Sequence, residues 1–280
     1  MSIEPVLKKG YLLLILICSL LGFPWLWQEI SLENAFQAPL ITKSPSPPSS
    51  ETLEALQQPY RYLGAGKQSV AFLSEDGKWV LKFFKKKYIR APFIARCFNL
   101  DKKKYQQRFG HYCESYLIAE KEFKQETALA YVHLGPSTAL PDTVCKDRLG
   151  ISHSLNLNEY PFVMQKRVES FYSLLTGPLT RQMIDQFLGF VAKRMAKGVA
   201  DRDQEIGRNF GTLGGAIVQI DPGRLYLDTT LNEQKRRDLE WWRSTHKLRR
   251  FLETNAPEEV AFFDQRLKAW QEETSAQSPV

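Results

Sequence analysis

Cysteine and histidine are scarce in this sequence of 280 residues, which contains four of each. No two cysteines stand at the C-x-x-C spacing that a zinc site favours, and no cluster of histidines accompanies them. A metal cage built from soft ligands is therefore excluded. Cys18 lies in an apolar segment, which leaves Cys97, Cys113 and Cys145. A disulfide between Cys97 and Cys113 is one arrangement of these three, and free buried thiols are the one that we favour.

The sequence also lacks internal repeats and a large excess of charge of one sign. The net charge at pH 7 is +7, with 43% hydrophobic and 25% charged residues. This composition is ordinary for a globular protein and allows one large domain or two small lobes. The modest basic surplus fits an anionic partner such as a nucleotide, a phospholipid or a nucleic acid, although solvated surface is the commoner explanation.

One long apolar run is present, at residues 11–27, and it contains no charged residue. A helix of about 17 to 20 such residues crosses a bilayer, and the aromatic residues at its two ends fit the membrane interfaces. A cleaved signal peptide is the alternative. Because the following sequence NAFQA is a poor cleavage site, we expect residues 1–30 to form an uncleaved membrane anchor.

Charges on the two sides of this run indicate its orientation. Lys8 and Lys9 precede it, and Glu29 and Glu33 follow it. The positive-inside rule then puts the N-terminus in the cytoplasm and the body of this single-pass protein on the other side. Residues 37–51 are rich in proline and serine, which is typical of a solvated spacer, and we expect a linker over residues 31–56.

The segment RYLGAGKQSVAFLSEDGKWVLKFF, residues 61–84, combines two glycines with alternating apolar residues. The turn signal at residues 74–78 predicts consecutive antiparallel strands at 62–65, 70–73 and 78–84. A dinucleotide-binding glycine turn would open a helix, so that interpretation is excluded. A plain hairpin and a loop folded over phosphates both fit this segment taken alone.

A second polar cluster lies in residues 196–225, which carry Asp201, Asp203, Asn209 and Asp221 around an apolar strand at 216–220. Carboxylate and amide oxygens are hard ligands of the kind that Mg²⁺ prefers. An additional aspartate in such a loop can position an attacking hydroxyl or accept its proton.

These two segments together resemble the protein-kinase-like superfamily. The first resembles G-x-G-x-x-G-x-V followed by V-A-I-K, with Ser69 in place of the third glycine. The resemblance implies that Lys82 contacts the α- and β-phosphates of ATP. The matching residues of the nucleotide site are Gly64, Gly66, Ser69, Ala71 and Lys82.

In the second segment, Asn209 resembles the catalytic-loop asparagine, and Asp221-Pro222-Gly223 resembles the DFG element. The resemblance implies that Asn209 and Asp221 bind Mg²⁺. GVADRD also looks like the catalytic segment of phosphoinositide kinases. Asp203 matches the catalytic aspartate by its distance from Asn209, whereas Asp201 matches it by the Asp-Arg pair. We favour Asp203 and leave Asp201 open.

Residues 115–134 have apolar side chains at helical spacing, and Glu122 and Glu126 lie one turn apart on this expected helix. The resemblance implies that one of them pairs with Lys82, and we favour Glu126. Residues 159–171 fit the strand and hinge that would meet adenine, where we place Gln165. We expect further helices at 179–197, 233–251 and 257–273, with Trp241, Trp242 and Trp270 in the core.

The expected fold is α+β and two-lobed, with a small antiparallel-sheet lobe over residues 57–165 and a reduced, mainly helical lobe over 166–280. We expect transfer of the γ-phosphate of ATP to a hydroxyl of a protein, lipid or small molecule. A catalytically inactive pseudokinase is the alternative, since Ser69 and Pro222 depart from the family pattern. Nucleic-acid binding through Lys102, Lys103 and Lys104 is less well supported, because stacking aromatics are not interleaved with these lysines.

The first prediction concerns the apolar run. If residues 11–27 anchor the mature protein, carbonate extraction of membranes will leave the full-length chain in the pellet. Recovery of a soluble chain that begins after residue 35 would identify a cleaved signal peptide instead.

Overall fold

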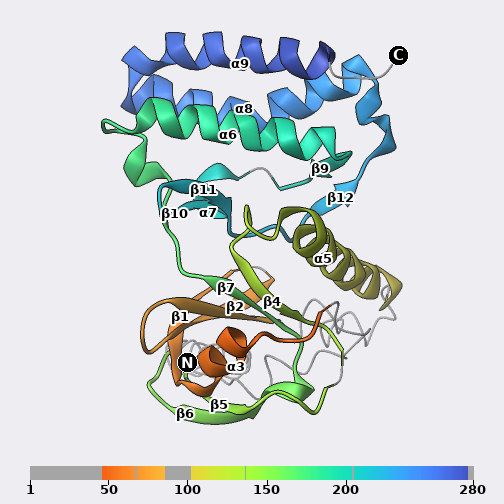
Figure 1. Ribbon diagram of the computed structural model, residues 1–280, viewed down its shortest axis with the longest axis vertical. Coiled ribbons are helices and arrows are strands. Elements are labelled where there is room, and N and C mark those ends of the chain that lie inside the picture. Colours follow the sequence, from red (N-terminus) through yellow and green to blue (C-terminus); the bar gives the residue numbers. More distant parts are fainter. Residues whose placement is uncertain (1–45, 67, 86–101, 136, 204, 277–280) are drawn as a thin grey trace, which may run out of the picture.

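The computed structural model describes residues 46–66, 68–85, 102–135, 137–203 and 205–276 (Figure 1). Two parts are stacked along the long axis of the molecule. A β-sheet with the short helix α3 forms one part, and three long helices form the other. Small strands and the helix α5 lie where the two parts meet (Figure 1).

The large sheet has seven strands in the order β4-β7-β3-β2-β1-β5-β6. The predicted meander is confirmed, since β1, β2 and β3 pair antiparallel in sequence, and β7 then pairs with β3 and β4. The turn between β2 and β3 is closed by Ser74 Oγ, which donates to Asp76 Oδ1 at 2.6 Å. The strands are β1 Tyr60–Ala65, β2 Ser69–Ser74, β3 Trp79–Phe84, β4 Leu129–His133, β5 Asp142–Lys146, β6 Ser152–Asn156 and β7 Phe162–Lys166.

The helix expected at 115–134 is wrong in both of its boundaries. Helix α5 spans Lys102–Phe123, and Leu129–His133 is the strand β4. The backbone N–H and the hydroxyl of Thr127 both bond to the carbonyl of Phe123, and Ala128 has a positive φ of 51°, which ends the helical path. A short apolar run fits a helix or a buried strand equally well, and pairing with β7 decides for the strand.

The linker expected over residues 31–56 is also partly wrong. Ser50–Gln57 form helix α3, which begins at the N-cap Ser49, whose hydroxyl accepts from Thr52 N at 3.1 Å. Ala55 and Leu56 are buried in the core on one face of the large sheet. The serine that suggested a spacer therefore caps a helix whose apolar side packs on the sheet.

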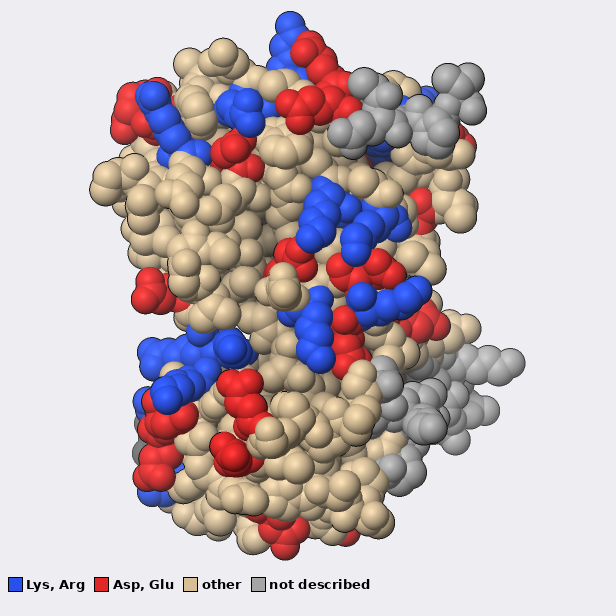
Figure 2. Space-filling view, viewed as in Figure 1, with Lys and Arg blue, Asp and Glu red and all other residues tan. Residues whose placement is uncertain are grey.

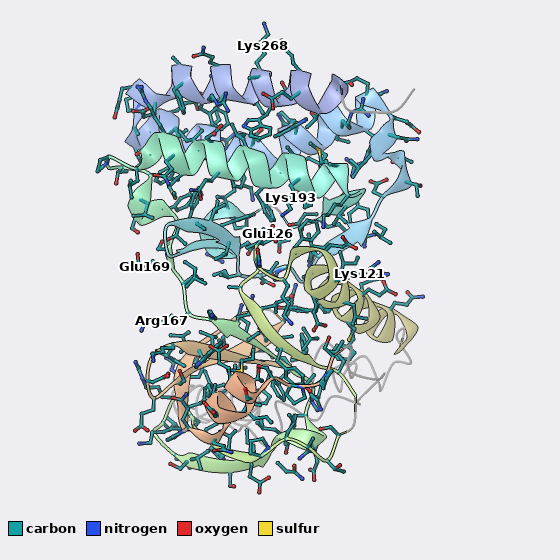
Figure 3. The ribbon with its side chains drawn as sticks, viewed as in Figure 1. Lys121, Glu126, Arg167, Glu169, Lys193 and Lys268 are labelled. Carbon is teal, nitrogen blue, oxygen red and sulfur yellow. The ribbon has the colours of Figure 1, made fainter. Side chains whose placement is uncertain are left out.

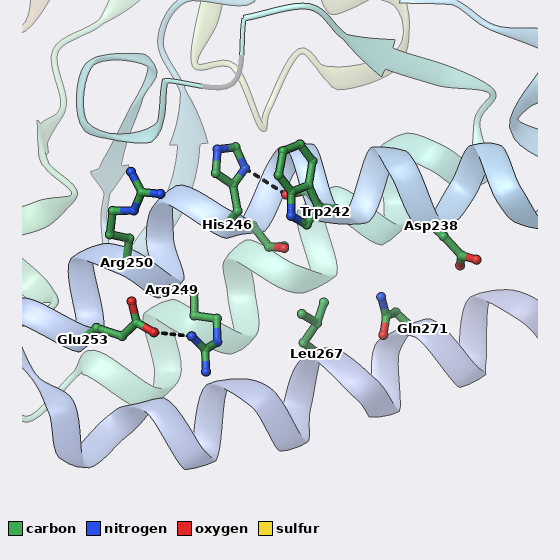
Figure 4. A pocket seen from close by; sticks show the side chains of 9 residues that line it. Asp238, Trp242, His246, Arg249, Arg250, Glu253, Leu267 and Gln271 are labelled. Atoms are coloured by element: carbon green, nitrogen blue, oxygen red, sulfur yellow. Dashed lines mark hydrogen bonds and ion pairs between the residues drawn. The ribbon is translucent and has the colours of Figure 1, made fainter.

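The helical part confirms the three helices expected at 179–197, 233–251 and 257–273. Helix α6 spans Thr180–Ala196, α8 spans Gln234–Asn255 and α9 spans Val260–Ala276. Trp241 is buried in their core as expected. Trp242 is not: it is 61% exposed, stacks on His246 and lines a groove between α8 and α9 (Figure 4). Trp270 is half-buried and donates through Nε1 to Asp185.

Short strands and turns build the junction between the two parts. Strand β10 pairs with β11 and β8, and β12 pairs with β9, all antiparallel. The larger hydrophobic core runs from α5 through this junction into α6 and α8. The short elements are β8 Glu169–Ser170, β9 Val199–Asp201, α7 Ile206–Asn209, β10 Phe210–Leu213, β11 Ala216–Gln219 and β12 Leu225–Leu227, with 3₁₀ turns at Leu157–Glu159, Tyr172–Leu174, Thr229–Asn232 and Pro257–Glu259.

Cys113 and Cys145 are free, buried thiols, as we favoured. Cys97 and the expected membrane anchor at 11–27 lie outside the described residues. Within the described part of the chain, no helix combines the length and the apolar character that crossing a membrane requires.

Candidate functional site

The glycine segment forms the hairpin between β1 and β2. Gly66 N donates to Ser69 O at 2.9 Å, and the β1–β2 register shifts between Tyr62 and Gly64. A Cβ added at Gly64 would meet no atom within 4 Å, one added at Gly66 would meet only Ser69 O at 3.9 Å, and neither glycine has a positive φ. The chain's own packing therefore does not require glycine here. The space above both residues is open to the close approach of a ligand.

Lys82 lies beneath this hairpin, on β3 between Ala71 of β2 and Val163 of β7. Its Nζ donates to the carbonyl oxygen of Ile220 at 2.5 Å, so it reaches the residue just before Asp221. Burial lowers the pKa of Lys82, and the charge of Asp221 opposes that shift. Ser69 and Ala71 are half-buried on β2, beside the same strand.

Asp221 and Asn209 are brought together by the turn after β11. Ile220 N donates to Asn209 O at 2.7 Å, and Asp221 Oδ1 accepts from Gly223 N at 3.3 Å. Burial raises the pKa of Asp221 while Lys82 opposes this, and the nearby charge of Asp203 raises it further. Lys82 of the sheet and Asp221 of this turn, far apart in the sequence, therefore lie close to each other.

The side-chain oxygen atoms of Asp221 and Asn209 are ligands of the kind that Mg²⁺ prefers. Asn209 donates its amide nitrogen to Asp203 O at 2.9 Å, which leaves the amide oxygen as the atom for a metal. Among the described residues, no group of three or more His, Cys, Asp or Glu could hold a metal ion. Two protein oxygens do not fill an octahedral shell, which suits Mg²⁺ because this ion keeps waters and phosphate oxygens as its other ligands.

The two candidate catalytic aspartates lie in different surroundings. Asp201 is 1% exposed and accepts from Gln219 Nε2 at 2.7 Å and from Asp203 N at 2.8 Å. Arg194 lies 3.6 Å from its Oδ2. The side chain of Asp203 is 43% exposed, with Arg224 Nε at 4.0 Å. Asp201 is therefore a buried part of the loop, and Asp203 is the one of the two carboxylates that is open to solvent.

The expected pair of Lys82 and Glu126 is not formed. Glu126 lies beyond the end of α5 and pairs with Lys193 of α6 (Figure 3). Glu122, the alternative, pairs at 2.9 Å with Lys197, which directly follows α6. Both glutamates therefore join the α5 region to the helical part. On the face in Figure 2, acidic and basic side chains gather at this junction.

The side of α5 that faces Asp221 is aromatic instead. Burial raises the pKa of Tyr116 well above its ordinary value, and the charges of Asp221 and Tyr112 add to the shift. The ring of Tyr116 also packs on Phe84, at 5.6 Å between centroids. Sequence reasoning missed these tyrosines, although Phe109, Tyr112, Tyr116 and Phe123 recur at helical spacing and mark a buried face.

Gln68 is a second residue that sequence reasoning missed. A Cβ built on Gly223 would lie 2.7 Å from Gln68 Oε1 and 3.1 Å from Asp221 Oδ1. The amide of the β1–β2 hairpin thus reaches the Asp-Pro-Gly turn, and a larger residue at 223 would displace the side chains of Gln68 and Asp221. No local sequence signal indicates this contact, because the two residues meet only through the fold.

Our expectation for Gln165 concerns the backbone groups of its strand, and the side chain of this residue is occupied within the protein. It lies within β7, is 1% exposed, and donates its amide to Thr127 O at 2.7 Å. The register of β7 turns this side chain toward the turn between α5 and β4. The connection to the helical part begins after Lys166, where Arg167 N donates to Lys78 O at 2.7 Å.

A glycine hairpin over a strand lysine, followed by an Asp/Asn loop and an Asp-x-Gly turn at the junction with a helical lobe, resembles the arrangement of protein-kinase-like folds. No protein-family model and no curated protein matches the chain. Solved structures do, at low similarity. A crystal structure of WbdD is 15% identical over 82% of this chain and 48% of that chain, with a TM-score of 0.42.

WbdD with the kinase inhibitor LY294002 matches at 15% identity over 77% of this chain and 45% of that one, with a TM-score of 0.36. The ROP18 kinase domain in complex with AMP-PNP and sucrose matches at 16% identity, 59% and 51% coverage, and a TM-score of 0.34. The chain therefore spans about half the length of these proteins. The kinase-like assignment depends on this chain's own elements rather than on such distant likenesses.

A second prediction follows from the burial of Asp201, which raises its pKa to about 6. Because the folded-state pKa lies above the unfolded one, the contribution of this group to stability is complete below the unfolded pKa, about 3.9. It is lost as the pH rises through 6. From pH 7.5 to 5.5, the unfolding free energy of wild type will therefore rise relative to that of Asp201→Asn, by an amount on the order of 1 kcal/mol. Urea unfolding of both chains at each pH measures this difference. A difference in unfolding free energy between the two chains that is the same at both pH values would contradict the raised pKa of Asp201.

Proposed function

We propose that this chain is a kinase-like phosphotransferase that moves the γ-phosphate of ATP to a hydroxyl group. The observation that carries the proposal is the approach of Lys82 and Asp221 beneath the open glycine hairpin, since each shifts the pKa of the other. A cation and a carboxylate at this position serve the two needs of phosphoryl transfer, phosphate binding and metal binding.

In this proposal, Lys82 holds the α- and β-phosphates while the backbone at Gly64 and Gly66 covers them. The carboxylate of Asp221 supports the protonated form of Lys82, against the effect of burial. Asp221 and Asn209 would hold Mg²⁺. When bound, this ion would neutralise the charge on the phosphate oxygens. Gln68, beside Gly223, helps to close the hairpin over the phosphates.

Asp203 is the residue that we propose to act on the acceptor. Its exposed carboxylate lies on the loop between β9 and α7, and its charge acts on Asp221. From there it can orient the attacking hydroxyl and accept its proton. Asp201 supports this role by accepting a hydrogen bond from Asp203 N, and it is a positioning residue in our proposal.

We further propose that residues 11–27 attach this kinase-like body to a membrane, with the body on the non-cytoplasmic side. The support is the uncharged length of the run and the lysines that precede it. The acceptor is then a molecule within reach of that surface.

A pseudokinase is the second candidate, and a specific observation favours it. The cation of Lys82 bonds to a backbone carbonyl, and no described glutamate of α5 pairs with it. In active kinases that partner orients the lysine. A module that binds a nucleotide or a partner without turnover does not need this orientation.

The third prediction separates these functions. Asp221→Ala will abolish Mg²⁺-dependent binding of ATP and any phosphoryl transfer, because the metal loses its charged ligand. Calorimetric titration of ATP and Mg²⁺ into the full chain in detergent measures this, with a thermal melt to verify folding. Asp238→Ala, at an exposed site on α8, is the matched control and will bind as wild type does.

Equal nucleotide affinity in wild type and Asp221→Ala would contradict the metal site. Binding of ATP that is independent of Mg²⁺, without transfer to any acceptor, would support the pseudokinase. Absence of binding to wild type would overturn both nucleotide functions.

A further inference from the structure

A groove of about 830 Å³ lies between α5 and β12. Ser115 of α5 donates to Leu225 O at 2.7 Å and so fixes the helix against the strand along the groove. The volume is within the range of about 300 to 1,000 Å³ that small-molecule sites occupy. Neither the nucleotide nor the metal of the proposed function accounts for this groove.

One end of the groove opens at the proposed catalytic residues. Gly223 and Arg224 line it and directly follow the Asp-Pro turn. Arg224 Nε lies 4.0 Å from Asp203 Oδ2. A molecule that fills the groove therefore has one end beside the carboxylate that accepts a proton, which is where an acceptor hydroxyl must be.

Two exposed arginines, Arg202 and Arg224, line this end of the groove. Glu114 is the acidic residue in the lining, and Asp203 lies beside Arg224 at 4.0 Å. Arg202 N donates to Arg224 O at 3.2 Å, so the backbones of the two arginines meet where β9 ends and β12 begins. The guanidinium of Arg202 lies over the ring of Tyr226, 4.4 Å from its centroid, and its side chain forms no ion pair within the described residues. A guanidinium group without an ion-pair partner is suited to a phosphate.

The rest of the wall is apolar. Leu117 and Ile118 of α5 are partly exposed, and Leu227 at the end of β12 is 68% exposed. An exposed leucine beside two arginines matches a molecule that has an anionic group at one end and an apolar part at the other.

We infer that the α5–β12 groove binds the acceptor, and that this acceptor carries a phosphate group next to its reacting hydroxyl. The inference rests on the proposed function. Arg202 and Arg224 bind the existing phosphate, and the hydroxyl lies at Asp203. Its oxygen forms a bond to the γ-phosphorus of ATP while the bond from that phosphorus to the β–γ bridging oxygen breaks. ADP leaves, and the hydroxyl proton passes to Asp203.

The same phosphate chemistry occurs in free polyol phosphates and in lipid headgroups, so the test uses one probe of each kind. Glycerol 3-phosphate and dioctanoyl phosphatidylglycerol are titrated into the full chain in non-ionic detergent, with ATP titrated separately. Arg202→Gln is compared with the matched control Arg148→Gln, an exposed arginine in the turn between β5 and β6. Leu227→Ser tests the apolar wall.

The fourth prediction is that at least one probe binds, and that Arg202→Gln weakens it about tenfold or more, as loss of a charge-assisted hydrogen bond does. ATP affinity will stay within about twofold, because Arg202 contacts no proposed nucleotide ligand. Arg148→Gln will bind as wild type does. If Leu227→Ser weakens only the lipid, the acceptor is a lipid; if it weakens neither, the acceptor is a soluble phosphate.

The inference fails if neither probe binds wild type, or if both arginine variants bind alike. Transfer of phosphate to an acidic peptide alone, with neither probe bound, would also overturn it. Binding of a probe through Arg202 by a chain that does not bind ATP would overturn the proposed function and leave the groove as a phosphate site. Binding of ATP without either probe would overturn the inference alone.

Discussion

The site depends on one buried cation, the guanidinium of Arg194. It lies 3.6 Å from Asp201 and donates to Glu240 Oε1 at 2.7 Å, and all three side chains are almost fully buried. The contacts join α6, β9 and α8. Removing one partner from a buried ion pair leaves an uncompensated charge, at a cost of about 3 to 5 kcal/mol. Asp201 in turn accepts hydrogen bonds from Asp203 N and from the side chain of Gln219 in β11. The position of Arg194 therefore determines that of Asp203 and, through β11, that of Asp221.

A second set of contacts fixes the sheet lobe to the helical lobe. Glu126 and Glu122 pair with lysines in and directly after α6, and Gln219 N donates to Glu126 O at 2.7 Å. The turn after α5 is thus attached to the strand that precedes Asp221. The glutamates that the kinase resemblance assigns to Lys82 are occupied in this junction, and Lys82 turns to the carbonyl of Ile220. Ion pairs of Glu126 and Glu122 that connect the two lobes have thus taken the place of the expected ion pair with Lys82 inside the small lobe.

The parts of the fold that sequence predicted are those determined by local pattern. The alternation around Gly64 and the turn at 74–78 predicted β1 to β3, and the helices expected at 179–197, 233–251 and 257–273 closely match α6, α8 and α9. The grouping of Asn209 with Asp221 followed from the short hairpin between them. The partner of Glu126 could not be predicted, because α5 ends at Phe123 and the left-handed residue Ala128 redirects the chain into β4. Asp201 and Asp203 have similar local sequences, and only the burial of Arg194 against Asp201 distinguishes them.

The aromatic face of α5 has a consequence for how ligands would be coupled. Tyr116 supplies no charge to Lys82, so the carboxylate whose charge opposes the effect of burial on this lysine is Asp221. The same carboxylate is the proposed metal ligand. In the proposed function, a metal bound to Asp221 would reduce the negative charge that opposes the effect of burial on Lys82, and phosphate oxygens would restore it. Metal without nucleotide would leave Lys82 as a poorly compensated buried cation, and nucleotide without metal would place phosphate charge beside Asp221. Each ligand would thus reduce the electrostatic cost of binding the other, so binding of the two would be coupled.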